Sequence, residues 1–139
     1  MKYKHLLLTL MTLISLSISS CDKDKDDNAE TPEGLAAKLL GTWQINAIII
    51  NEIFGGADHI SNYPGTAADY VEFKSNGKMH TFFRGQLDVS NYKVISDKKI
   101  TIDSDEADVK TITDNSLVIY TRDITGSIGY TEVTYDLKR

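Results

Sequence analysis

Residues 70–83 read YVEFKSNGKMHTFF, and this stretch predicts two antiparallel strands joined by a tight turn. Apolar and polar residues alternate on both sides of Asn76-Gly77, which is the period-two pattern of half-buried strands. Asn-Gly is the strongest short hairpin signal, because both residues tolerate the positive φ angles of a type I′ turn. The segment therefore favours an all-β protein.

The period-two pattern continues along most of the chain after a short helix. Thr31 is expected to cap this helix, with Pro32 at its first position. Eight strands are expected, at about 42–50, 69–75, 78–84, 89–95, 98–103, 108–113, 116–123 and 130–138. Eight antiparallel strands can remove their edges by closing on themselves. We therefore expect an up-and-down antiparallel β-barrel.

The links between these strands alternate in length. Tight turns are expected at 75–77, 96–98 and 114–115, and longer links at 51–68, 85–88, 104–107 and 124–129. Alternate links of a meander fall at the same end, so the long links would gather at one end of the barrel. The loop over 51–68 is the longest, and loops of this length are usually lids, binding loops or disordered segments.

Gly41-Thr42-Trp43 opens the first expected strand directly after the helix. This triplet resembles the Gly-x-Trp signature of lipocalins and related calycins, and 70–78 and 112–119 resemble segments of short lipocalin-like lipoproteins of the Bacteroidetes. The resemblance spans about 35–139. It implies a lipocalin-like barrel in which a basic residue near the end of the last strand, Lys138 or Arg139, packs across the ring of Trp43. The position of Trp43 makes it a plug at the closed end.

The N-terminus has the pattern of a secretory signal peptide. Lys2 and Lys4 precede an uncharged run over 6–20, which is shorter than the roughly 20 apolar residues of a transmembrane helix. The chain's only cysteine follows, and Ile18-Ser19-Ser20-Cys21 resembles the lipobox of bacterial lipoproteins. The resemblance implies acyl chains on Cys21 as the membrane anchor, and two or more chains anchor stably.

We expect three parts: a signal peptide over 1–20, a charged flexible tether over 21–33 and the barrel over 34–139. The charges after Cys21 resemble the surface-export signal of Bacteroidetes lipoproteins, which implies the outer face of the outer membrane; the periplasmic face is the alternative. A net charge of −5 argues against nucleic acid as a partner, because phosphates require basic patches. The barrel is expected to be a monomer.

Two functions are left open by the sequence. The first is non-catalytic binding of a small, partly apolar ligand at the long-loop end of the barrel. Its candidate residues are Phe54, His59, Tyr63, Phe82, Arg84, Tyr120 and Arg122. The alternative is a filled barrel without an internal ligand, whose surface contacts a protein or a glycan. The volume of the barrel interior distinguishes the two.

Catalytic and metal sites have little support in the sequence. No nucleophile motif, metal-spaced histidine pair or phosphate-binding loop is present. The acidic turn over 103–108 lacks the glycine and the distal glutamate of an EF-hand loop, which favours a solvated turn over a calcium site. We therefore expect no enzymatic activity, no metal and no cofactor.

Overall fold

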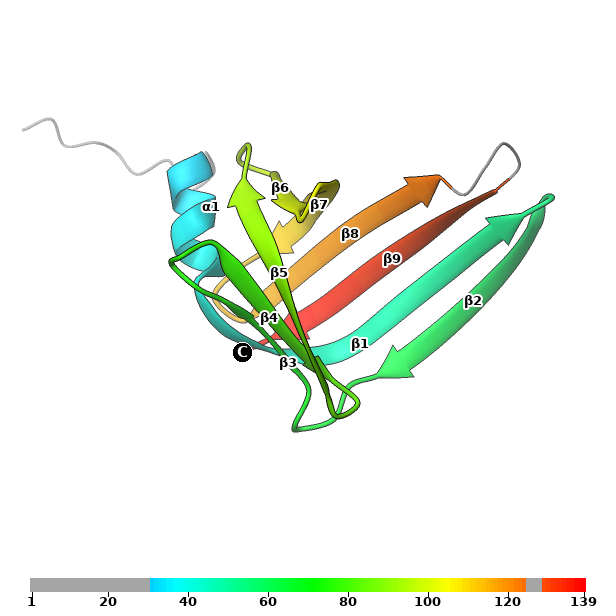
Figure 1. Ribbon diagram of the computed structural model, residues 1–139, viewed down its shortest axis with the longest axis horizontal. Helices are drawn as coiled ribbons and strands as arrows, with labels where there is room; N and C mark the ends of the chain where they lie inside the picture. The colour runs from blue at the N-terminus through cyan, green and yellow to red at the C-terminus, as the bar shows by residue number, and fades with distance from the viewer. Residues whose placement is uncertain (1–30, 125–128) are drawn as a thin grey trace, which may run out of the picture.

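The computed structural model describes residues 31–124 and 129–139, which form one β-sheet and a short helix (Figure 1). The elements are α1 (Pro32–Leu39), β1 (Gly41–Phe54), β2 (Ala57–Pro64), β3 (Tyr70–Phe73), β4 (Lys78–Phe83), β5 (Gln86–Val94), β6 (Lys99–Ile102), β7 (Asp105–Ile112), β8 (Ser116–Ile124) and β9 (Gly129–Lys138). The predicted signal peptide, Cys21 and most of the predicted tether lie outside the described residues.

Eight strands, β1 and β3 to β9, close into the antiparallel barrel that the sequence predicts. The closure depends on β1, which pairs with β3 over 41–44 and with β9 over 44–54. A β-bulge lies between Ile45 and Ala47, where the neighbour on one side of β1 changes from β3 to β2. The first and last strands of the barrel thus meet along nearly the whole length of β9.

The prediction of a long loop over 51–68 is wrong, because most of this segment forms a β-hairpin. β1 continues to Phe54, and Gly55-Gly56 turn the chain directly into β2, which pairs with β1 from Ala57 to Pro64. The φ angles of the two glycines are +60° and +83°. Two positive φ angles in a two-residue link are the requirement of a type I′ hairpin turn. The two glycines therefore make a tight turn inside the segment that was predicted to be a lid, a binding loop or disordered.

Two further links that the sequence predicts as long are also tight turns. Arg84-Gly85 joins β4 to β5, and Asp103-Ser104 joins β6 to β7. Arg84 and Asp103 adopt φ angles of +52° and +54°. Tight turns permit such angles at a short polar residue such as Asp103 and next to a glycine, as at Arg84-Gly85. The strands that follow these turns, β5 and β7, each begin three residues earlier than predicted, so the barrel has no cluster of long loops here. Most of the fourth predicted long link, over 124–129, lies outside the described residues.

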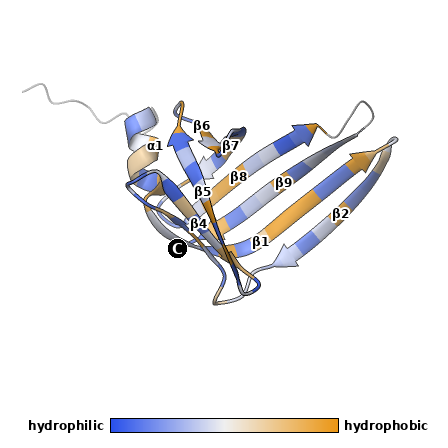
Figure 2. Ribbon diagram, viewed as in Figure 1, coloured by the Kyte–Doolittle hydropathy of each residue, from blue (hydrophilic) through white to orange (hydrophobic). Residues whose placement is uncertain are grey.

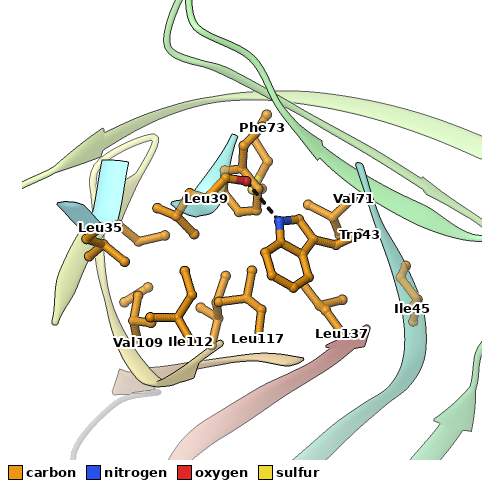
Figure 3. Packing of buried hydrophobic residues seen from close by; sticks show 14 of the residues in the cluster. Leu35, Leu39, Trp43, Ile45, Val71, Phe73, Val109, Ile112, Leu117 and Leu137 are labelled. Atoms are coloured by element: carbon orange, nitrogen blue, oxygen red, sulfur yellow. Dashed lines mark hydrogen bonds between the residues drawn. The ribbon is translucent and has the colours of Figure 1, made fainter. Parts of the chain in front are cut away.

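The predicted helix is present, and it covers one end of the barrel. The hydroxyl of Thr31 accepts a hydrogen bond from the Gly34 N–H at 3.1 Å, and Pro32 opens the first turn, where a missing N–H costs nothing. Leu35 and Leu39 are fully buried against the barrel (Figure 3). The core of buried apolar residues also includes Trp43, Ile45, Ile48, Val71, Phe73, Met79, Ile100, Ala107, Val109, Ile112, Leu117, Ile119 and Leu137.

Four strands run far beyond this packed end of the barrel (Figure 1). We call this extension the projecting sheet; it consists of 49–54 in β1, 57–62 in β2, 120–124 in β8 and 129–134 in β9. None of its residues is buried, and Phe54, Ile60 and Ile124 are among the most exposed large apolar residues described. Figure 2 shows that the apolar stretch of β1 continues into it. The rest of the described chain is called the barrel end.

Candidate functional site

Side chains fill the interior of the barrel end. The cavity between the strands has a volume of about 10 Å³, which is close to the minimum for a single water molecule. Its walls are Val71, Met79, Thr81, Ile102, Ile119, Tyr135 and Leu137. Pockets for small organic ligands usually measure roughly 300–1,000 Å³. The interior of the barrel end therefore has no room for such a ligand.

Tyr135 stands at the open side of this filled interior. Burial raises the pKa of its hydroxyl, and the negative charge of Asp88 on β5 raises it further. The two residues belong to strands on different walls of the barrel, β9 and β5. A phenol in this position packs its ring against the core and keeps its hydroxyl protonated at neutral pH.

Trp43 holds the closed end of the barrel together. It is fully buried, and its indole N–H donates to the carbonyl of Leu39 at 2.8 Å, which ties the helix to the barrel (Figure 3). The guanidinium carbon of Arg139 lies 3.8 Å from the centroid of the Trp43 ring, the contact that the lipocalin resemblance implies. Arg139 also donates to the carbonyls of Lys38 and Leu40. Gly41 precedes this cluster with a φ angle of +102°, which favours glycine.

Asp69 lies where the barrel end meets the projecting sheet. It is almost fully buried, and its carboxylate accepts hydrogen bonds from the Thr66 hydroxyl at 2.7 Å, the Thr66 N–H at 2.8 Å and the Arg84 N–H at 2.8 Å. These donors hold the pKa of Asp69 below its ordinary value, with the Thr66 hydroxyl as the largest cause. The carboxylate therefore connects the β2–β3 link to the β4–β5 turn.

Of the predicted ligand residues, Tyr63 and Arg84 meet directly beside Asp69. The Arg84 guanidinium carbon lies 4.6 Å from the centroid of the Tyr63 ring and 5.2 Å from that of Phe83. Tyr63 packs against the core from the inner side of β2. Phe82 points to the opposite face of β4, where it stacks on Tyr70 with ring centroids 5.7 Å apart. The structure therefore separates Phe82 from this pair.

Tyr120 and Arg122, also predicted, face outward on the projecting sheet, because they alternate along β8 with the side of the strand that carries buried Leu117 and Ile119. The Tyr120 hydroxyl donates to the Glu132 carboxylate at 2.6 Å, and this bond is the main cause of the raised pKa of Tyr120. The guanidinium carbon of Arg122 lies 3.7 Å from the Tyr130 ring centroid. We call these four residues on the outer face the outer platform.

Each aromatic ring of the outer platform is covered by a cation. Arg122 lies over Tyr130, and the ammonium group of Lys110 lies 4.8 Å from the centroid of Tyr120. The amide of Asn51 on β1 adds a long contact of 3.4 Å to the Glu132 carboxylate. The platform thus combines aromatic, cationic and anionic groups that are linked across β8, β9 and β1.

Phe54 and His59 lie together at the tip of the β1–β2 hairpin, apart from the other predicted residues. Both are exposed. They border an open hollow of about 610 Å³ together with Glu52, Ile53, Ala57, Asp58, Tyr130 and Thr131. The seven residues predicted to share one site therefore occupy four places. These are the tip of the β1–β2 hairpin, the region beside Asp69 where the barrel end meets the projecting sheet, the outer face of β4 and the outer platform.

Sequence reasoning missed Tyr130 and Glu132. Their place beside Arg122 depends on the register of β8 and β9, which pairs Arg122 with Glu132 and Ile124 with Tyr130. The alternation of β9 did put Glu132 on the face away from the core. Aligning this face of β9 with the outward-facing residues of β8 could have predicted the outer platform from the sequence.

Comparison with models of protein families finds no match, and no curated protein or solved structure matches the chain. Over residues 31–124 and 129–139, no helix is long and apolar enough to cross a membrane. The same residues contain no group of three or more potential metal ligands that could hold an ion. In the acidic turn, the carboxylates of Asp103, Glu106 and Asp108 instead bind Asn91, Lys99 and Lys110.

Proposed function

We propose that the protein is a lipid-anchored, non-catalytic interaction module of the bacterial outer membrane, which binds a protein partner through the outer platform. The filled interior carries this proposal. The packed interior has only about 10 Å³ of free space, whereas hollows of about 290 and 610 Å³ open to the outside, which supports the surface as the place for recognition. The barrel end then serves as the rigid base for the projecting sheet.

The chemistry of the outer platform fits a protein better than a glycan. Tyrosine and arginine are enriched where proteins contact one another, and both are present here. Sugars commonly bind by stacking on an open aromatic face, but Arg122 and Lys110 already cover the faces of Tyr130 and Tyr120. Hydroxyl, guanidinium and carboxylate groups remain available at the ring edges for a polar partner surface.

Photo-crosslinking tests the platform in the full chain expressed in bacterial outer membranes. Benzoylphenylalanine replaces Tyr130 on the platform or, as the matched control, Tyr70 on the outer face of the barrel end. We expect a discrete adduct with a different protein from position 130 only, and its loss when Arg122→Ala is added. The same adducts from both positions, or none from position 130, would contradict the proposal.

The membrane anchor is proposed on different grounds. Ile18-Ser19-Ser20-Cys21 resembles a lipobox, and the charged residues after Cys21 suit a tether that ends in surface export. A Cys21→Ser variant cannot carry the thioether-linked lipid, so it should leave the membrane fraction as soluble protein. A variant that stays in the membrane fraction would show that another feature holds the chain there.

A small, partly apolar ligand is the second candidate, and the hollow at the hairpin tip favours it. Phe54 offers an exposed ring and His59 a polar group on the same hairpin. Such a ligand would bind at the tip instead of inside the barrel. Phe54→Ala should then abolish the retention of a co-purifying small molecule. Tyr130→Ala tests in the same way whether the β9 side of the hollow contacts that molecule.

A further inference from the structure

The outer edge of β2 is a free sheet edge in the described chain. β2 is the first strand in the sheet order and pairs only with β1, whereas the pairing of β1 with β9 closes the rest. Natural edge strands usually carry lysines, bulges or a covering element that prevent pairing with another chain. The sequence of β2, ADHISNYP, has no lysine or arginine, and its pairing with β1 shows no bulge.

The register shows which backbone groups of β2 point away from β1. The Gly65 N–H donates to the Asn46 carbonyl at 3.0 Å, next to the Ala47/Pro64 pair. Such a bond flanks a pair without mutual hydrogen bonds, and the two kinds of pair alternate along an antiparallel ladder. The type I′ turn at Gly55-Gly56 gives the same assignment from the other end. Three residues with free outward N–H and C=O groups follow: Asp58, Ile60 and Asn62.

We propose that β2 pairs antiparallel with β2 of a second copy of this chain, about a two-fold axis at Ile60. Ile60 would exchange both backbone hydrogen bonds with Ile60 of the second copy. Asp58 would exchange them with Asn62 of the second copy, and Asn62 with Asp58. All three outward residues on each copy find partners in this register, and the two sheets keep the same face outward.

The side chains fit the same register. Ile60 is 66% exposed, and the two-fold axis places it against another Ile60. Asp58 is the only acidic residue of β2, and it would face the amide of Asn62 instead of a second carboxylate. Pro64 lacks an N–H and lies at the end of the strand, where the pairing ends. Apolar contact, charge and hydrogen bonding therefore agree on one alignment.

This dimer differs from the monomer expected from the sequence, and it does not rest on the proposed function. The interface uses the edge of β2, whereas the outer platform lies on β8 and β9. In the dimer, the two projecting sheets would join into one continuous sheet, with both platforms on the same side.

Cysteine cross-linking tests the register in the full chain, with the parent as the control for cross-links through Cys21. Hydrogen-bonded pairs have Cα atoms roughly 5.5 Å apart, which lies within disulfide range. Ile60→Cys should give a disulfide-linked dimer under mild oxidation. Asn62→Cys alone should not, because the two copies of residue 62 would lie about 13 Å apart. A mixture of Asp58→Cys and Asn62→Cys chains should cross-link. Equal cross-linking of all single variants, or none of Ile60→Cys, would overturn the proposal.

A pair of proline variants separates dimerisation from folding. Ile60→Pro removes an outward N–H, so the chain should keep its circular dichroism spectrum while the dimer is lost in analytical ultracentrifugation. His59→Pro removes an N–H that pairs with β1, so it should also loosen the hairpin. A folded Ile60→Pro chain that remains dimeric at the parent's concentration would exclude the β2 edge as the interface.

Discussion

The barrel end and the projecting sheet share the strands β1, β8 and β9 but differ in what surrounds them. β1 carries fully buried Trp43 near its start and ends at Phe54, which is 62% exposed. At the barrel end, side chains from opposite walls and from α1 meet in one core. On the projecting sheet no residue is buried, and only residues nearest the barrel end, such as Ile50 and Val133, pack against that core. A single strand thus has a structural half and an accessible half.

The difference indicates a division of roles along the barrel. Tight packing at the barrel end supplies the stability, because buried apolar area is the dominant favourable term in folding. The projecting sheet adds little to it and keeps polar and aromatic groups in contact with solvent. Changes at the two ends should therefore have unequal effects on stability.

Trp43→Ala is the largest expected loss at the barrel end. It removes the plug, its hydrogen bond to Leu39 and the contact with Arg139, and such truncations of buried aromatic residues cost about 3–5 kcal/mol. Phe54→Ala on the projecting sheet is the matched control and should cost below about 0.5 kcal/mol. Urea unfolding followed by circular dichroism measures both. Equal costs would remove the proposed difference between the two ends.

Asp69→Asn should have the next largest effect. The Asp69 carboxylate accepts three hydrogen bonds, whereas the NH₂ group of an asparagine would face one of the N–H or O–H donors of Thr66 and Arg84. The folded-state pKa of Asp69 lies below the ordinary value of 3.8. Its contribution is therefore complete above about pH 4 and is lost as the pH falls through the folded pKa.

Melting temperatures measured between pH 7 and pH 2 test this sign. The parent should lose stability toward low pH more steeply than Asp69→Asn, so the two curves should approach one another. A constant difference between them at all pH values would show that the charge of Asp69 does not matter.

Arg139→Gln tests the cation–π contact at the closed end. The exposed arginine contributes about 0.5–1 kcal/mol through the Trp43 ring, in addition to its bonds to two carbonyls. We expect a small decrease in the free energy of unfolding and a change in the emission of Trp43, the only tryptophan. Arg122→Gln, with a similar contact on the projecting sheet, should leave that emission unchanged.

Glu132→Gln should have the smallest effect on stability, below about 0.5 kcal/mol, because it changes a half-buried polar network on the outer face and no core residue. It removes the carboxylate that raises the pKa of Tyr120. The alkaline ultraviolet titration of the variant should therefore contain one tyrosine that ionises at lower pH than in the parent. Identical titration curves would show that Tyr120 and Glu132 do not interact in solution.

The sequence predicts the barrel well, because closure follows from alternating patterns and turn chemistry that are local. Thr31 and Pro32 locate the helix start, and Asn76-Gly77 locates a hairpin. The hairpin at Gly55-Gly56 was misread, because glycine pairs fit both a tight turn and a flexible loop. Local pattern alone does not distinguish these cases, whereas the pairing partner does.

The candidate site was harder to predict than the fold. Tyr120 and Arg122 were placed on one strand face, but the direction of that face depends on which neighbours reach the core. The filling of the interior is also a property of the whole barrel, since seven residues from different strands define the remaining space. Neither property is encoded in any one segment.

Native mass spectrometry of the full chain, purified from its own host in mild detergent, tests the central claim most directly. The claim is that the barrel end is filled and that recognition takes place on the projecting sheet. We expect masses that correspond to the processed, acylated chain alone or in pairs, with no additional small molecule. A small molecule retained at one per chain, and still retained in Phe54→Ala and Tyr130→Ala, would place a ligand inside the barrel and contradict the account.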